Sequence, residues 1–166
     1  MNDKDIPVTI ERIKTRAEIE FCAHLRASSD PWLTLQRDYD DAIKSITATD
    51  HEVYVAKSKD DIMGFAVVSV TGVLIGFLLT LCIVPDYQRL GIGAKLLAYS
   101  EERIFKESPN VFLMVSSFNT GAQTFYEKHG YRKIGELENY IIRGYSEFLM
   151  RKSIGPHNEF YKMKSG

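Results

Sequence analysis

The sequence contains few of the residues that stabilise small secreted folds or hold metals. Only two cysteines are present, Cys22 and Cys82, and they lie far apart without C-x-x-C spacing. This pattern supports neither a disulfide framework nor a cysteine-based zinc site, so we expect a reduced, cytoplasmic setting and no metal. Met1–Pro7 also lacks the apolar stretch that a signal peptide requires.

An excess of one charge is also missing. The chain has 21 basic and 22 acidic residues, a net charge of −1, and no long basic block before its C-terminal tail. The charge pattern therefore marks no nucleic-acid surface, and we expect no nucleic-acid partner. A chain of 166 residues that is 45% hydrophobic suits one globular domain with a buried core. The oligomeric state stays open, a homodimer included.

One stretch, residues 62–84, has no charged residue and is long enough to span a bilayer. Three glycines interrupt it, Val and Ile are frequent, and Thr71-Gly72 forms a turn signal near its centre. These features favour two buried strands joined by a tight turn. We therefore predict no membrane-spanning segment.

The periodicity of apolar residues predicts the remaining elements. Strands are expected over 8–13, 52–57, 62–70, 74–84, 111–116, 133–142 and 145–151, and helices over 16–27, 37–47, 92–107 and 119–129. The helical crossover between strands 74–84 and 111–116 predicts that these two are parallel neighbours. The prediction is an α/β fold with a mixed, mostly antiparallel sheet of six to seven strands and helices on both faces. One domain would cover residues 1–152, and 153–166 would form a flexible tail.

The segment Gln88-Arg89-Leu90-Gly91-Ile92-Gly93 lies between a buried strand and the start of a helix. Such a junction directs unpaired N–H groups and the positive end of a helix dipole at one point, which suits a phosphate. A dinucleotide-binding loop would need glycine at Leu96, and a P-loop would need Gly-Lys-Ser/Thr. The alternative is a helix start with no ligand, although each glycine costs roughly 1 kcal/mol against alanine there.

This loop matches the Q/R-x-x-G-x-G/A pyrophosphate loop of the GNAT superfamily of N-acetyltransferases. A second segment, which holds Asn119, Ala122, Phe125, Tyr126 and Gly130, is similar to the following helix of that family. Together the two motifs and the order of elements make residues 8–152 resemble the family. The resemblance implies a sheet splayed between strands 74–84 and 111–116, with acetyl-CoA bound in the gap.

The implied activity is direct transfer of an acetyl group from acetyl-CoA to a primary amine in a ternary complex. The main chain of Leu81, Cys82 and Ile83 would pair with the pantetheine arm, Asn119 would contact the cofactor, and Tyr126 would protonate the departing thiolate. One main-chain donor on the thioester carbonyl would be worth about 3 kcal/mol. The loop residues that would bind the cofactor are Gln88, Arg89, Leu90, Gly91, Ile92, Gly93 and Ala94.

The general base is not identified by the resemblance. The branch that acetylates protein N-termini would have a glutamate at the position of Met114, and no carboxylate stands there. Because that carboxylate is missing, an acyl-CoA-binding regulatory module with weak or no catalysis stays a second possible function. Glu138 and Glu147 fit solvated strand residues better than a base. The remaining candidates for the base are Glu52, Glu138, Glu147 and His51, or a water held by the main chain and Tyr140.

The acceptor amine is also open: a peptide N-terminus, a lysine side chain, a polyamine and an amino sugar all fit. Its pocket would have Trp32 and Tyr39 on one side and Tyr140 and Tyr145 on the other. The alternative interpretation of Trp32 and of Tyr126 is an ordinary core aromatic, and Cys82 fits a small hydrophobic residue of a central strand.

Overall fold

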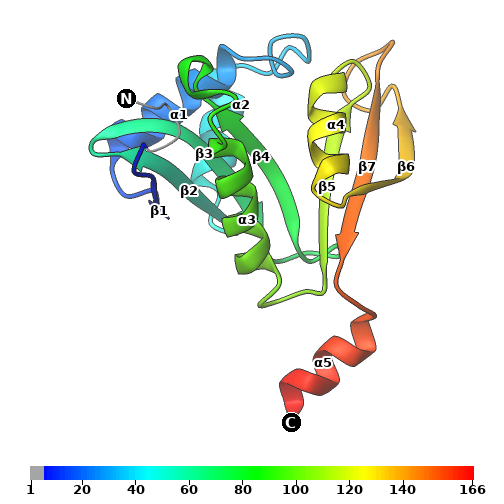
Figure 1. The fold of residues 1–166 in the computed structure, drawn as a ribbon. Coiled ribbons are helices and arrows are strands. Elements are labelled where there is room, and N and C mark those ends of the chain that lie inside the picture. The colour runs from blue at the N-terminus through cyan, green and yellow to red at the C-terminus, as the bar shows by residue number, and fades with distance from the viewer. Residues whose placement is uncertain (1–5) are drawn as a thin grey trace.

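The computed structural model describes residues 6–166, so the expectation for Met1–Pro7 falls mostly outside the described residues. Seven strands form one sheet in the order β1-β2-β3-β4-β5-β7-β6 (Figure 1). Each neighbouring pair is antiparallel except β4 and β5, which are parallel. The elements are β1 (Thr9–Arg12), α1 (Arg16–Ala27), α2 (Tyr39–Thr47), β2 (His51–Ser58), β3 (Asp61–Ser69), β4 (Phe77–Ile83), a 3-10 turn (Pro85–Tyr87), α3 (Ile92–Ile104), β5 (Asn110–Ser116), α4 (Thr120–Lys128), β6 (Arg132–Glu138), β7 (Ser146–Ser153) and α5 (His157–Ser165).

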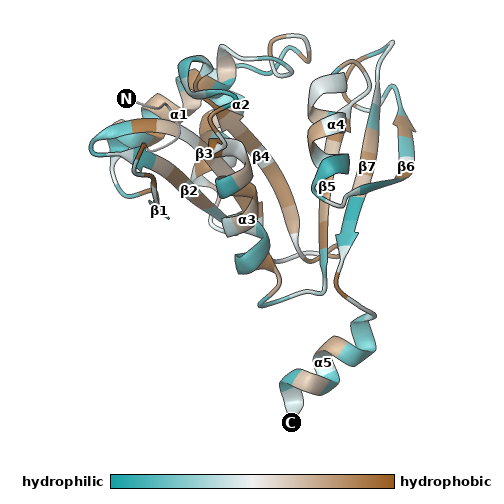
Figure 2. Ribbon diagram, viewed as in Figure 1, coloured by the Kyte–Doolittle hydropathy of each residue, from teal (hydrophilic) through white to brown (hydrophobic). Residues whose placement is uncertain are grey.

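Helices cover both faces of this sheet, as the sequence predicts. Tyr54 and Ala56 of β2 pack with α3 and α4, whereas Val53 and Val55 of the same strand pack with α1 and α2. Successive residues of a strand point to opposite faces, so each central strand contributes to two apolar layers. Figure 2 shows the resulting hydrophobic residues along β2, β3 and β4. The mixed, mostly antiparallel α/β architecture is confirmed.

The sheet opens between β4 and β5. The two strands pair only at Phe77 with Phe112 and at Leu78 with Leu113, and beyond these pairs they diverge (Figure 1). Close approach at the start requires Gly76, where an added Cβ would lie 2.4 Å from the carbonyl oxygen of Asn110. The predicted parallel pair and the splay are therefore both present.

The stretch over residues 62–84 forms β3, β4 and the turn between them. The register between the strands slips by one residue, because Thr80 faces Val67 and Leu78 faces Val68, so that Leu79 is a bulge. A bulge bends its strand, and here the bend starts where β4 leaves β5. Within residues 6–166 no helix is long and apolar enough to cross a bilayer.

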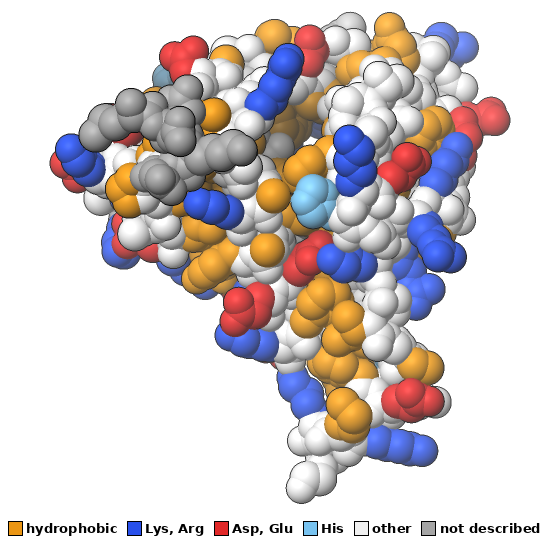
Figure 3. Space-filling model, viewed as in Figure 1, with side chains coloured by type: hydrophobic (Ala, Val, Ile, Leu, Met, Phe, Trp, Pro, Cys, Tyr) orange, Lys and Arg blue, Asp and Glu red, His pale blue; other side chains and the backbone are white. Residues whose placement is uncertain are grey.

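Several boundaries differ from the prediction, since β4 begins at Phe77 rather than at Leu74 and α3 ends at Ile104 rather than near residue 107. β6 ends at Glu138 rather than near residue 142, because Asn139 and Gly144 take positive φ angles and turn the chain. The C-terminal segment, for which we predicted an irregular tail, contains the helix α5, whose Tyr161 hydroxyl donates a 2.7 Å hydrogen bond to the Glu107 carbonyl. Hydrophobic side chains are visible on α5 and just above it (Figure 3).

Candidate functional site

Two adjoining cavities occupy the opening between β4 and β5. Their volumes are about 560 and 370 Å³. Both are bounded by β4 on one side and by the start of α4 on the other, so a group bound in one lies next to the contents of the other. The residues that line both cavities are Pro31, Trp32, Leu81, Asn119, Ala122 and Tyr126.

The larger cavity ends at the loop before α3. Gly91 is the N-cap of α3, with a φ of 81° and no side-chain cap. The first N–H groups of a helix have no acceptor within the helix, so here they are left to the cavity together with the positive end of the dipole. The lining residues that the sequence assigned to the cofactor are Leu81, Cys82, Ile83, Gln88, Arg89, Gly91, Gly93, Ala94, Asn119 and Tyr126.

Two loop residues of that assignment, Leu90 and Ile92, do not line this cavity. Ile92 is 2% exposed and belongs to the core under α3, and Leu90 packs against the same core. Their side chains anchor the loop, and only their main chain could reach a bound anion. The loop thus alternates between residues that face the cavity and residues that fix it to the sheet.

The edge of β4 offers further main-chain groups to the larger cavity. β3 pairs with Leu81, Cys82 and Ile83 along one edge of β4, while β5 pairs with no residue of β4 beyond Leu78. The opposite edge of these three residues is therefore free to hydrogen-bond an extended ligand, as a further strand would. Free backbone groups and an uncapped helix start together fit a long ligand with a phosphate at one end.

Tyr126 lies where the two cavities meet. Its side chain is 9% exposed and packs edge-on against Phe125 and Tyr131, with ring centroids 5.3 and 5.6 Å away. Burial raises the pKa of the Tyr126 hydroxyl, which keeps the phenol protonated and able to donate. The α4 helix that carries Tyr126 starts at Asn119, whose side-chain oxygen accepts a 3.2 Å hydrogen bond from the Ala122 N–H.

The cysteines are not poised as nucleophiles. Cys82 lines the larger cavity but is 4% exposed, and burial raises its pKa to about 12. Cys22 is fully buried, and burial raises its pKa to about 12 as well. Thiols with raised pKa values stay protonated and inert near neutral pH. Both residues act as small core side chains.

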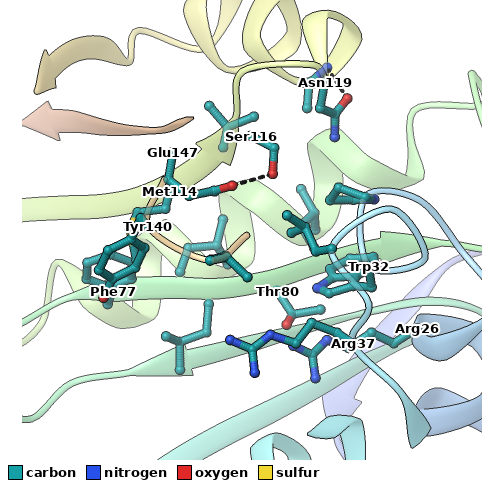
Figure 4. A pocket seen from close by; sticks show the side chains of 18 of the residues that line it. Arg26, Trp32, Arg37, Phe77, Thr80, Met114, Ser116, Asn119, Tyr140 and Glu147 are labelled. Atoms are coloured by element: carbon teal, nitrogen blue, oxygen red, sulfur yellow. Dashed lines mark hydrogen bonds between the residues drawn. The ribbon is translucent and has the colours of Figure 1, made fainter. Parts of the chain in front are cut away.

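The smaller cavity contains a buried carboxyl group. Glu147 of β7 is 4% exposed, and its Oε1 accepts a 2.6 Å hydrogen bond from the Ser116 hydroxyl of β5 (Figure 4). Burial raises the pKa of Glu147, and the bond from Ser116 opposes that shift. The expectation that Glu147 is a solvated strand residue is therefore wrong.

The other candidates for a base lie elsewhere. Glu52 accepts bonds of 2.8 and 2.9 Å from Arg103, the His51 ring nitrogen Nδ1 is 2.7 Å from the Ser45 carbonyl, and Glu138 is exposed on β6. The cavity walls therefore include none of these three candidates, Glu52, His51 and Glu138. Among residues 6–166 no cluster of three or more His, Cys, Asp or Glu side chains could hold a metal ion.

The four aromatic residues assigned to the acceptor pocket separate into two pairs. Trp32 lines both cavities and Tyr140 lines the smaller one. Tyr39 instead packs against His24 and Tyr145 against Phe118, with ring centroids 4.5 and 4.8 Å apart. The structure brings neither Tyr39 nor Tyr145 to a cavity wall.

Two arginines in the smaller cavity were missed by the sequence analysis. Arg26 of α1 and Arg37, which precedes α2, both line it, beside Thr80 and opposite Glu147 (Figure 4). A signal for Arg26 was present, because it follows Ile19, Cys22 and Ala23 at helical spacing and so lies next to the buried face of α1. An arginine in that position has to be folded against the core or to face a cavity.

Comparisons with known proteins agree with this geometry. The profile of the acetyltransferase (GNAT) domain matches residues 49–133. An N-alpha-acetyltransferase of Sulfurisphaera tokodaii is 33% identical over 78 residues, which are 45% of this chain and 46% of that protein. The match thus spans about half the length of this curated relative.

Solved structures resemble the whole sheet. The ribosomal-protein-S18-alanine N-acetyltransferase from Escherichia coli has a TM-score of 0.71 at 20% identity, covering 90% of this chain and 96% of its own. The aminoglycoside 6'-N-acetyltransferase from Enterococcus faecium has a TM-score of 0.71 at 16% identity, covering 90% and 98%. A structure of an aminoglycoside 6'-N-acetyltransferase complexed with coenzyme A gives the same values.

Proposed function

The chain belongs to the GNAT acetyltransferase family, and we propose that it moves the acetyl group of acetyl-CoA directly to a primary amine in a ternary complex. The observation that carries this proposal is the junction of the two cavities at Tyr126, with an uncapped helix start on one side and the buried Glu147 on the other. Relatives and structural neighbours named as acetyltransferases of amines and a neighbour complexed with coenzyme A support it.

In this proposal acetyl-CoA occupies the larger cavity. The N–H groups of residues 89–94 hold its pyrophosphate, because they are unpaired and lie at the positive end of α3. The free edge of Leu81–Ile83 pairs with the pantetheine arm and directs the thioester toward Tyr126. The same main chain can donate to the thioester carbonyl, where one donor is worth about 3 kcal/mol in the transition state.

The amine occupies the smaller cavity, and Glu147 takes its proton, directly or through one water. The nitrogen then attacks the thioester carbon, a C–N bond forms, the C–S bond breaks, and the sulfur leaves as a thiolate. Tyr126 gives its proton to that thiolate, and the second proton that the nitrogen loses on becoming an amide returns through water to the Tyr126 oxygen. Glu147, on the neighbouring strand β7, thus acts as the general base. Met114 cannot do so, because its side chain has no carboxylate.

A screen of amines with detection of released CoA thiol tests the proposal. Acetylation of at least one peptide, polyamine, amino sugar or amino acid, dependent on Glu147 and Tyr126, is the expected result. The alternative, an acyl-CoA-binding regulatory module, would bind acetyl-CoA tightly in calorimetry and release no thiol with any amine. That combination would overturn the enzymatic proposal.

A further inference from the structure

The smaller cavity has opposite charge character on its two walls. Four charged side chains line it: Arg26, Arg37 and Asp41 on the side of α1 and α2, and Glu147 on the side of β7. Figure 4 shows Arg26 and Arg37 together near Thr80 and Trp32, while the Ser116–Glu147 pair lies across the cavity. A ligand in this space therefore meets guanidinium groups at one end and a carboxyl group at the other.

Arg26 is held in place but is short of a partner. Its guanidinium lies 5.4 Å from the centre of the Trp32 ring, and its Nη1 donates a 3.2 Å hydrogen bond to the Asp41 carbonyl. Its Nε is buried and has no hydrogen-bond partner within residues 6–166. Burial lowers the pKa of Arg26, so an anion bound beside its guanidinium in the cavity would stabilise the charge.

The neighbouring charges do not supply that anion. Asp41 lies 3.5 Å from Arg37, and its other carboxylate oxygen accepts a 3.3 Å bond from the Asp38 N–H at the start of α2. The Asp41 carboxylate is thus shared between Arg37 and the N-terminus of α2. Its single negative charge does not balance the positive charges of both Arg26 and Arg37. Thr80, whose buried hydroxyl also lacks a partner within the described residues, lies on the same wall.

We propose that the acceptor is a small amine that also carries an anionic group, bound by Arg26 and Arg37 while its amine faces Glu147. This inference rests on the proposed transfer to an amine and names the class of that amine. Guanidinium groups match the planar geometry of a carboxylate or the oxygens of a phosphate. A cavity of about 370 Å³ suits a small molecule. Polyamines, which are polycations, are disfavoured by two arginines in the same space, and a simple amino sugar offers these arginines no anion.

The test compares matched amines with and without the anion. γ-Aminobutyrate, its carboxamide and putrescine share a primary amine on a chain of similar length, and alanine with alaninamide forms a second pair. We expect kcat/KM, measured by release of CoA thiol, to be at least about tenfold higher for the acid of each pair than for its amide. A factor of this size corresponds to the free energy of a hydrogen bond to a charged group. An aminoalkyl phosphate added to the panel shows which anion the arginines prefer, and preference for either supports the proposal.

The arginine variants connect this preference to the two side chains. Arg26→Gln and Arg37→Gln should each lower kcat/KM for the acid about tenfold or more and leave the value for the amide nearly unchanged. Arg16→Gln is the matched control, because Arg16 is also on α1 but pairs with Glu20 on the surface. If Arg26→Gln unfolds, as a thermal melt would reveal, Arg37→Gln carries the test, since its side chain is 45% exposed.

The two proposals fail in different ways. No thiol release with any amine would overturn the transferase function itself. Release that is equal or faster with putrescine and the amides would leave that function intact and would overturn only the inference about the anion. A preference for acids that survives both arginine substitutions would also overturn it.

Discussion

The Ser116 hydroxyl donates a 2.6 Å hydrogen bond to the carboxyl group of Glu147 across the paired strands β5 and β7. Both side chains are buried, at 2% and 4% exposure, on the wall of the smaller cavity. The bond fixes the orientation of a carboxyl group whose pKa is raised by burial, and it opposes that rise. A buried carboxyl with a raised pKa in a cavity is a candidate proton acceptor.

Glu147→Gln should lower kcat by about 100-fold or more, the usual contribution of a positioned general base. In the wild type, kcat/KM should fall as the pH drops through the pKa of Glu147, which burial raises from its usual value. The variant should lose that acid limb, because glutamine does not titrate. A pH profile of thiol release measures both effects.

Glu138→Gln is the control for this experiment, since Glu138 lies on the neighbouring strand β6 but is exposed. It should keep the wild-type rate and the wild-type acid limb. Ser116→Ala should shift the acid limb to higher pH, because the hydroxyl that opposes the rise in the pKa of Glu147 is removed. An unchanged limb in Glu147→Gln would rule out Glu147 as the base.

Tyr126→Phe should lower kcat by about 100-fold and leave the Kd of acetyl-CoA nearly unchanged. The ring keeps its contacts with Phe125 and Tyr131, so the melting temperature should not move appreciably. Tyr99→Phe, a substitution of a half-exposed tyrosine on α3, controls for general effects. Stopped-flow release of thiol and calorimetry with acetyl-CoA separate the two quantities, and an unchanged kcat would exclude proton donation by Tyr126.

The elements that could be predicted from the sequence are those with local signals. Gly91 begins a helix after a buried strand, Asn119 caps the next helix, and both were recognised from residues close in the chain. The parallel pairing of β4 and β5 followed from a general rule on crossovers. The position of the larger cavity depends on these same features, so the residues around it could be predicted from the sequence.

The lining of the smaller cavity was harder to predict, because its residues meet only in the folded chain. Glu147 lies between Ser146 and Phe148 at the start of β7, and nothing in that sequence tells which face meets a cavity until the register with Ser116 is known. The environment of Arg26 depends on Trp32 and Asp41, which approach it through a loop and a second helix. Helix α5 is mostly polar and has no buried residue, so its sequence resembles that of an irregular tail.

Gly91→Ala should weaken acetyl-CoA binding because the loop depends on a left-handed residue. At a φ of 81° a Cβ meets no atom within 4 Å, so the cost is conformational, about 1–2 kcal/mol of unfolding free energy. Relaxing that strain would rotate the N–H groups that face the cavity, and the Kd measured by calorimetry should rise several-fold.

Gly72→Ala is matched to it, with a φ of 88° and the same open space, in the turn between β3 and β4. It should lose similar stability and bind acetyl-CoA as the wild type does. Equal affinity in the two variants would show that the loop before α3 does not hold the cofactor.

Glu18→Gln should destabilise the fold in a pH-dependent way. Glu18 closes the capping box of α1 with Thr15 and forms an ion pair with Lys57, and these interactions lower its pKa to about 2. A carboxyl whose pKa is lowered by folding stabilises the protein above its unfolded pKa, near 4.3, and loses that contribution as the pH falls toward 2. Urea denaturation should show a deficit of about 1–2 kcal/mol at neutral pH that shrinks over this range. Glu20→Gln is the control, because it removes a surface pair with Arg16 and should change the free energy of unfolding by less than about 0.5 kcal/mol. A deficit in Glu18→Gln that stays constant with pH would contradict the charge-based explanation.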